Sequence, residues 1–138
     1  MPCRVSRWLE IFLSEEVIQR IPDVAGEKRS FEELVTSIST RFINLRAHEI
    51  DDGIRGALRQ VGEFAGVDRS YLFLCSSDGL RMSNTHEWCA PGIEPQIDSL
   101  QDMPFEIMPW WAERLRSRET IHIPRVSDMP PDAAADRK

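Results

Sequence analysis

The fold is decided by residues 69–92, which read RSYLFLCSSDGLRMSNTHEWCAPG. Residues 71–75 are apolar and rich in aromatics, a composition that favours a strand buried on both faces. Residues 76–79 then supply a turn, because an Asp side chain can bond its own backbone and Gly tolerates positive φ. Residues 80–90 continue as a second strand, which the following Pro-Gly pair stops. The stretch predicts a β-hairpin.

Polar side chains are concentrated in the second strand of this hairpin. With a side-chain period of two, Asn84, His86 and Trp88 lie on one face together with Met82. The alternating residues form the other face: Ser83, Thr85, Glu87 and Cys89. Because neither face is uniformly apolar, one of them is predicted to line something polar.

Two amphipathic helices are predicted before the hairpin. Ser30 opens the first with a capping box to Glu33. Its apolar stripe has three- and four-residue spacing: Phe31, Leu34, Val35, Ile38, Phe42 and Ile43. The second helix begins around residues 47–49 and ends at Gly66, a suitable left-handed cap. Such helices beside an apolar hairpin predict an antiparallel sheet with helices packed on one face.

The chain after the hairpin is predicted to be less regular. Residues 93–104 form a loop with a short helical turn, and a helix runs from Pro109 to about Arg118. Residues 120–123 are predicted to be a short strand, and a further helix starts at Pro131 or the residue after it.

Four segments together resemble a known family: FAGVDRSYLF (64–73), NTHEWCAPGI (84–93), PWW (109–111) and IHIP (121–124). Over residues 31–138 the chain resembles a GAF domain, the small-molecule-sensing module of bacterial multidomain signalling proteins such as sensor kinases and diguanylate cyclases. The resemblance implies an α+β fold, an antiparallel sheet with helices packed on it. It also implies a regulatory domain that transmits a signal through flanking helices to an output domain, a kinase or a cyclic-nucleotide enzyme. GAF-like modules continue with further central strands, so a C-terminally truncated domain is expected here.

Two units are predicted along the chain, a helical extension with a linker over residues 1–29 and an incomplete GAF-like domain over residues 30–138. The extension is apolar on more than one side between Trp8 and Ile21. Two explanations of this surface remain open, a homodimer contact and docking on the chain's own domain.

Composition excludes several classes of function. The net charge is −6, from 17 basic and 23 acidic residues, which argues against a nucleic-acid surface. No segment approaches the roughly 18 apolar residues that cross a bilayer, so a cytoplasmic protein without a membrane partner is predicted. Cys3, Cys75 and Cys89 are too few and scattered for a disulfide framework, and no Cys-x-x-Cys pair indicates a metal site.

Five residues are the candidate ligand-binding set: Asn84, His86, Trp88, Trp110 and Trp111. Tryptophan offers a flat apolar surface to a planar ligand, although the adjacent pair could equally pack the sheet. His86 could bond a ligand or haem, or simply a neighbouring backbone carbonyl. The sequence identifies neither the ligand nor a cofactor.

Catalysis has no positive signature in the sequence. Nucleophile triads, phosphate-binding loops and dinucleotide fingerprints are all missing. A redox enzyme would have to use Cys75 or Cys89; in some GAF-like photoreceptors a cysteine holds a bilin, but Cys89 lacks the surrounding motif. We therefore predict a non-enzymatic sensory domain for an unknown small molecule, with a ligand-free dimerisation or protein-interaction module as the alternative.

Overall fold

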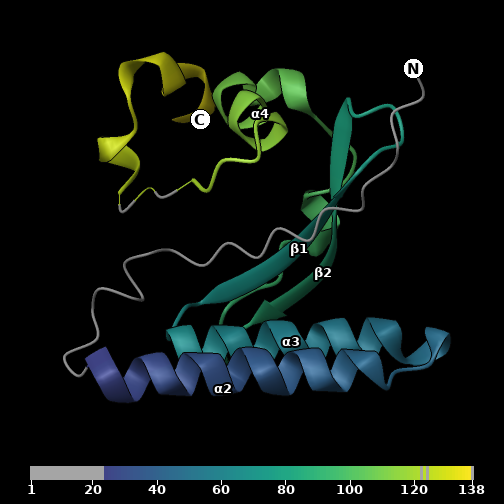
Figure 1. Ribbon diagram of the computed structural model, residues 1–138. Coiled ribbons are helices and arrows are strands. Elements are labelled where there is room, and N and C mark those ends of the chain that lie inside the picture. Colours follow the sequence, from purple (N-terminus) through teal and green to yellow (C-terminus); the bar gives the residue numbers. More distant parts are fainter. Residues whose placement is uncertain (1–23, 122, 124, 138) are drawn as a thin grey trace.

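A computed structural model describes residues 24–121, 123 and 125–137 of the chain. Within them it has three α-helices and a three-stranded antiparallel sheet, which confirms the α+β fold class. The helices α2 and α3 lie side by side, the sheet rises from α3, and α4 with the C-terminal segment lies on the opposite side of the sheet (Figure 1). The predicted helical extension before the linker lies outside the described residues, and so do the first two residues of the linker, 22 and 23.

Helix α2 spans Val24–Ile43 and therefore begins before the predicted start at Ser30. The predicted capping box at Ser30 is wrong, since this residue lies inside the helix. The physical reason is that residues 24–29 contain good helix formers, and the glycine among them costs only about 1 kcal/mol. The predicted division of the chain at residues 29 and 30 consequently falls within one helix.

Helix α3 spans Ile50–Ala65 after the 3-10 turn η1, Ala47–Glu49, where the second helix was predicted to begin. Gly66 ends α3 in the left-handed conformation, with φ 63° and ψ 33°, which confirms the predicted cap. The buried residues of α3 are small or branched: Gly53, Ala57, Leu58, Val61 and Gly62.

The hairpin has the predicted form, with β1 at Arg69–Cys75 and β2 at Arg81–Cys89. The prediction that β1 is buried on both faces was wrong. Leu72, on the face toward α3, is only 3% exposed. Tyr71 and Phe73, on the opposite face, are half-buried. Leu58 of α3 is buried like Leu72, and burying such a side chain contributes about 1.5–3 kcal/mol.

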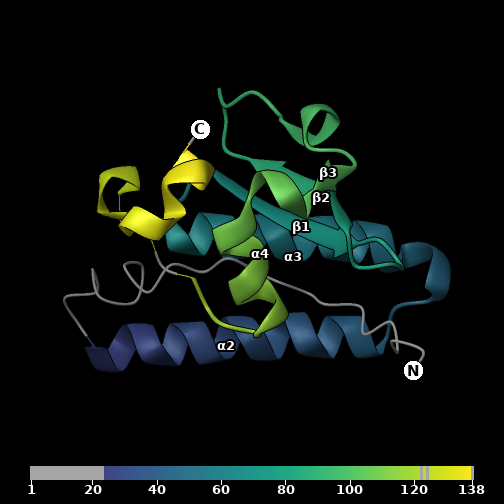
Figure 2. The same cartoon turned by 90° about the horizontal axis from the view of Figure 1, so that it is seen from above.

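A third strand, β3 at Met103–Pro104, pairs with the start of β2 and was not predicted. The sheet order is β1-β2-β3, so β1 is an edge strand. Figure 2 shows that α2 lies beyond this β1 edge, so the helical layer is wider than the sheet.

Helix α4, Pro109–Arg116, begins at the predicted proline and ends two residues early. The short elements around it are helical turns: η2 Ile97–Ser99, η3 Phe105–Ile107, η4 Val126–Asp128 and η5 Pro131–Arg137. The predicted strand at residues 120–123 is wrong for its described part, because Ile121 and Ile123 carry no strand pairing. They pack instead against a second core of Trp110, Met129 and Ala133.

Candidate functional site

A β-bulge in β2 separates the predicted ligand-binding residues. Leu72 pairs with His86, but the next residue, Phe73, pairs with Asn84. Thr85 is therefore an extra residue that is paired with no residue of β1. Paired residues share a face of the sheet and neighbours on one strand alternate. Asn84 therefore lies on the face opposite to His86, and the prediction that both share a face was wrong, because the extra residue breaks the period of two.

His86 lies between the sheet and α3. Its Nε2 is 3.2 Å from Oδ1 of Asp51, and its Nδ1 is 2.9 Å from Oγ1 of Thr85. Both ring nitrogens thus have partners in the chain, which leaves neither for a ligand or haem. In place of the backbone carbonyl that was one of its predicted partners, His86 contacts the carboxylate of Asp51 in α3 and the hydroxyl of Thr85 in the bulge. Nothing in the sequence around Asp51 indicated this contact, which joins residues 35 positions apart.

Trp88 lies on the same face and packs against α3. A Cβ placed on Gly62 would overlap the six-membered ring of Trp88, so the indole lies directly on the helix backbone. The sequence signal for this contact was a glycine in a helix interior, which often marks a close approach. His86 and Trp88 together hold α3 on the sheet.

The opposite face of the sheet carries Asn84, which is 1% exposed. Its backbone is bonded on both sides: the N–H donates to the Leu100 carbonyl (2.8 Å), and its carbonyl accepts from Nε2 of Gln101 (2.7 Å). Its side-chain Nδ2 and Oδ1 have no hydrogen-bond partner among the described residues. An unpartnered buried polar group costs about 1–3 kcal/mol. Such a group in a folded protein calls for an explanation.

Glu87 shares this face, since it pairs with Tyr71 as Asn84 pairs with Phe73. Its side chain is 4% exposed, and Oε2 accepts the N–H groups of Gln96 and Ile97 at 2.8 and 2.9 Å. These bonds fix the turn η2 against the sheet. The prediction that His86 and Glu87 lie on opposite faces is confirmed by the register.

Arg69 completes the anchoring of the segment after β2. Its Nε is 3.7 Å from Oε1 of Glu87, and its guanidinium donates to the carbonyl of Glu94. Residues 94–101 are thereby bonded to the sheet at Arg69, Asn84 and Glu87.

We call the surface formed by Tyr71, Phe73, Asn84 and Glu87 the Asn84 face. Its two aromatic rings meet edge to face with centroids 5.7 Å apart. It combines half-buried aromatic rings with the buried Asn84 side chain, whose Nδ2 and Oδ1 have no hydrogen-bond partner among the described residues. Of the five predicted ligand-binding residues, only Asn84 belongs to it.

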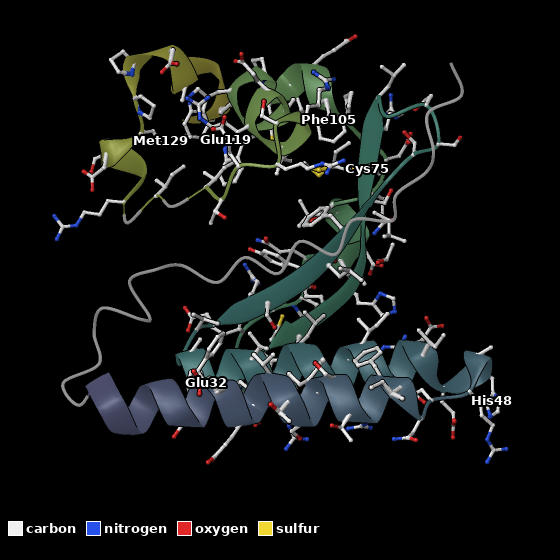
Figure 3. All side chains as sticks on the ribbon, in the orientation of Figure 1. Glu32, His48, Cys75, Phe105, Glu119 and Met129 are labelled. Carbon is white, nitrogen blue, oxygen red and sulfur yellow. The ribbon has the colours of Figure 1, made fainter. Side chains whose placement is uncertain are left out.

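Trp110 and Trp111 lie in α4 and form a separate cluster. The guanidinium carbon of Arg114 is 3.8 Å from the centre of the Trp110 ring, and Met129 packs on the same core (Figure 3). The backbone N–H of Trp111 donates to Oδ2 of Asp136 at 3.0 Å. The flat surface predicted for a planar ligand is thus largely used for packing.

Metal and thiol chemistry finds no geometric support in the described part of the chain. No cluster of three or more His, Cys, Asp or Glu side chains that could hold a metal occurs there. Cys89 pairs with Arg69 at one end of the hairpin and Cys75 pairs with Met82 at the other, so these two thiols are not neighbours. Across the described residues, no helix is long and apolar enough to cross a membrane.

Comparison with known proteins finds a regulatory relative. The chain is similar to a segment of the methanogenesis regulatory histidine kinase FilI of Methanothrix harundinacea (strain 6Ac), with 31% identity over 101 residues. The alignment covers 70% of this chain, and the chain spans 11% of that kinase. No protein-family description and no solved structure matches the chain. The assignment to the GAF family therefore stays a prediction.

Proposed function

We propose that the chain is a regulatory, non-enzymatic domain that binds a small molecule and transmits the signal through its helices to an output domain. The observation that carries this proposal is the Asn84 side chain, fully buried with both amide atoms unpartnered on an aromatic sheet face. One ligand that offers an acceptor and a donor would satisfy both atoms. The similarity to a segment of a regulatory histidine kinase supports a place in signal transduction, with a kinase as the output domain.

Binding at the Asn84 face has a physical route to the helices. The backbone of Asn84 is bonded to Leu100 and Gln101, so movement of its side chain is linked to the segment that covers the sheet. Two residues further along β2, His86 is bonded to Asp51 of α3. A ligand that favours one position of β2 would therefore shift the population of α3 positions, which is the basis of signal transmission.

The proposal is tested by thermal unfolding of the 138-residue chain in the presence of a small-molecule library. We expect at least one compound to raise Tm, since a ligand at about 100 times its Kd stabilises the folded state by about 2.7 kcal/mol. The Asn84→Ala variant should lose this shift. The matched control is Asn44→Ala, which removes an exposed amide that bonds the Thr40 carbonyl. If the library leaves Tm unchanged, or if Asn84→Ala responds like the unmodified chain, binding at the Asn84 face is refuted.

A ligand-free dimerisation module is the second candidate. The observation that favours it is the exposure of apolar side chains on α2, where Val35 is 46% and Ile43 83% exposed. The segment that first suggested a dimer contact, residues 8–21, lies outside the described residues. Analytical ultracentrifugation of the chain and of the Ile43→Glu variant tests the dimerisation module. A dimer that dissociates in the variant supports this candidate, and a monomer at all concentrations rejects it.

A further inference from the structure

The segment between β2 and β3, residues 93–102, is attached to β2 by polar bonds, and we call it the strap. Its first half is held by Glu87, whose Oε2 accepts the N–H groups of Gln96 and Ile97. Its second half is held by Asn84, which uses both its backbone N–H and its carbonyl. Segments that are attached mainly by polar bonds open more easily than elements of a hydrophobic core.

The ladder between β2 and the strap contains one extra residue. Met82 pairs with Met103 of β3, so a regular ladder would bring Asn84 opposite Gln101. The Asn84 N–H donates instead to the carbonyl of Leu100, one residue further along. The strap therefore has a bulge immediately before β3, which separates it from the regular pairing of that strand.

Asp102 lies at this bulge in the left-handed conformation, with φ 51°. Bulges of this kind usually have glycine at the left-handed position, because a Cβ is strained there. Asp102 is held by two side chains of β2. Its N–H donates to Oγ of Ser83 at 2.8 Å, and Nε of Arg81 donates to its Oδ1 at 2.6 Å. The Arg81 guanidinium also donates to the Asp102 carbonyl. A strained backbone persists where such bonds hold it in place.

The other end of the strap also has a residue in the left-handed region. Gly92 has φ 85°, and a Cβ placed there would meet no described atom within 4 Å. It follows the bond that closes the hairpin, in which the Ala90 N–H donates to the Asp68 carbonyl. Rotation at Gly92 and Asp102 would therefore move the strap and leave the hairpin and β3 in place. End residues that absorb such rotations act as hinges.

The burial of Asn84 requires that some neighbouring segment moves before a ligand binds. The side chain is on the sheet face that we call the Asn84 face, and the residue is only 1% exposed. Glu87 lies on the same face and bonds the strap with its side chain, so the strap reaches this face. The strap is thus the segment whose movement is coupled most directly to Asn84.

We propose that the strap opens as one unit about Gly92 and Asp102, and that the Arg81–Asp102 pair is the latch that keeps it closed. Opening frees both bonded backbone groups of Asn84 at once, so the strap and Asn84 move together. The strap then controls ligand access to the Asn84 face. This control rests on the proposed function, whereas the opening itself does not.

Amide hydrogen exchange of the 138-residue chain, without any ligand, tests the opening. The strap contact bonds the N–H groups of Asn84, Gln96, Ile97 and Asp102. We expect their protection factors to agree within about threefold, because one opening exposes them all. The Leu72 N–H, which ladder alternation directs to β2, should be at least about tenfold better protected. Protection that differs widely within the strap, or that equals the protection of Leu72, overturns the proposal.

The Asp102→Asn variant tests the latch, because asparagine tolerates the left-handed conformation but carries no charge. The exposed ion pair is lost, so exchange of the strap N–H groups should become about two- to fivefold faster, with Leu72 unchanged. Asp98→Asn, the same change at an exposed position of the strap, is the matched control and should have no effect. An Asp102→Asn strap that exchanges like the unmodified one, or faster only at residue 102, refutes the latch.

Failure of the strap is distinguishable from failure of the proposed function. For a compound that raises Tm, the association rate should increase in Asp102→Asn by the same factor as the exchange, because the open state is more populated. An unchanged association rate would show that the strap does not control access, although the Asn84 face binds. Strap exchange as expected, with no compound that raises Tm, would refute the ligand and leave the opening established.

Discussion

Asp78, in the turn of the hairpin, is the residue whose titration responds most clearly to the fold. Its Oδ1 accepts the Ser76 hydroxyl and the Leu80 N–H, and these bonds lower its pKa. Because the pKa is lower in the folded state, the contribution of Asp78 to stability is fully present above the pKa of the unfolded chain. It is lost as the pH falls through the folded pKa.

We predict that Ser76→Ala moves the pKa of Asp78 back toward its ordinary value, since it removes the strongest of these bonds. The measurement is an NMR titration of the Asp78 side chain. Ser77→Ala, an exposed change in the same turn, is the matched control and should leave the titration unchanged. An unshifted pKa in Ser76→Ala would show that the hydroxyl does not stabilise the carboxylate.

Single residues in β2 also show which placements the sequence could predict and which it could not. Alternation along β2 correctly placed His86 and Glu87 on opposite faces, because no irregularity lies between them. It misplaced Asn84, because the bulge at Thr85 inserts one residue and local composition carries no sign of it. The bond between His86 and Asp51 depends on how α3 crosses the sheet, which no local pattern specifies.

At the scale of elements, the packing of α3 on β2 depends on the absence of a side chain at Gly62. We predict that Gly62→Ala destabilises the fold by about 1–3 kcal/mol, since the added methyl would overlap the Trp88 ring. Gly56→Ala, in the same helix, is the control. Its nearest neighbour is the flexible end of Arg41, so it should gain up to about 1 kcal/mol from helix propensity. Urea unfolding measures both, and equal effects would contradict the packing of Trp88 on Gly62.

Helix α4 depends on a distant residue for its N-terminal cap. Its N-cap position is Met108, which makes no side-chain cap bond, and Asp136 accepts the Trp111 N–H in its place. We predict that Asp136→Ala costs about 1 kcal/mol, the usual value of a lost cap. Asp136→Asn keeps an acceptor and should cost less. Urea unfolding monitored by tryptophan fluorescence compares the two, and equal losses would mean that the carboxylate does not act as the cap.

Elements were predicted well where a residue imposes a stop or a start. Gly66 ended α3, and Pro109 opened α4, because each fixes a backbone conformation locally. The start of α2 was missed, since residues 24–29 combine a helix-tolerated glycine with helix formers. The strand β3 was missed because two residues, Met103 and Pro104, give no periodic signal.

For the whole molecule, the α+β class followed from two apolar helical stripes and one hairpin. The assembly of the candidate site did not. The tryptophans singled out for their flat surfaces pack against Gly62 and Arg114, whereas the unpartnered polar group belongs to Asn84. Which face a polar residue occupies, and whether its bonds are satisfied, emerges only when all elements are in place.

The central claim, that a small molecule is bound at the Asn84 face, is tested most directly by NMR of the Asn84 side-chain amide. Any compound that raises Tm should shift the Asn84 Nδ2 proton signals and slow their exchange, because the unpartnered group gains a hydrogen bond. The indole signal of Trp88, on the face toward α3, should change less. A compound that stabilises the chain while leaving the Asn84 amide signals in place would contradict the account.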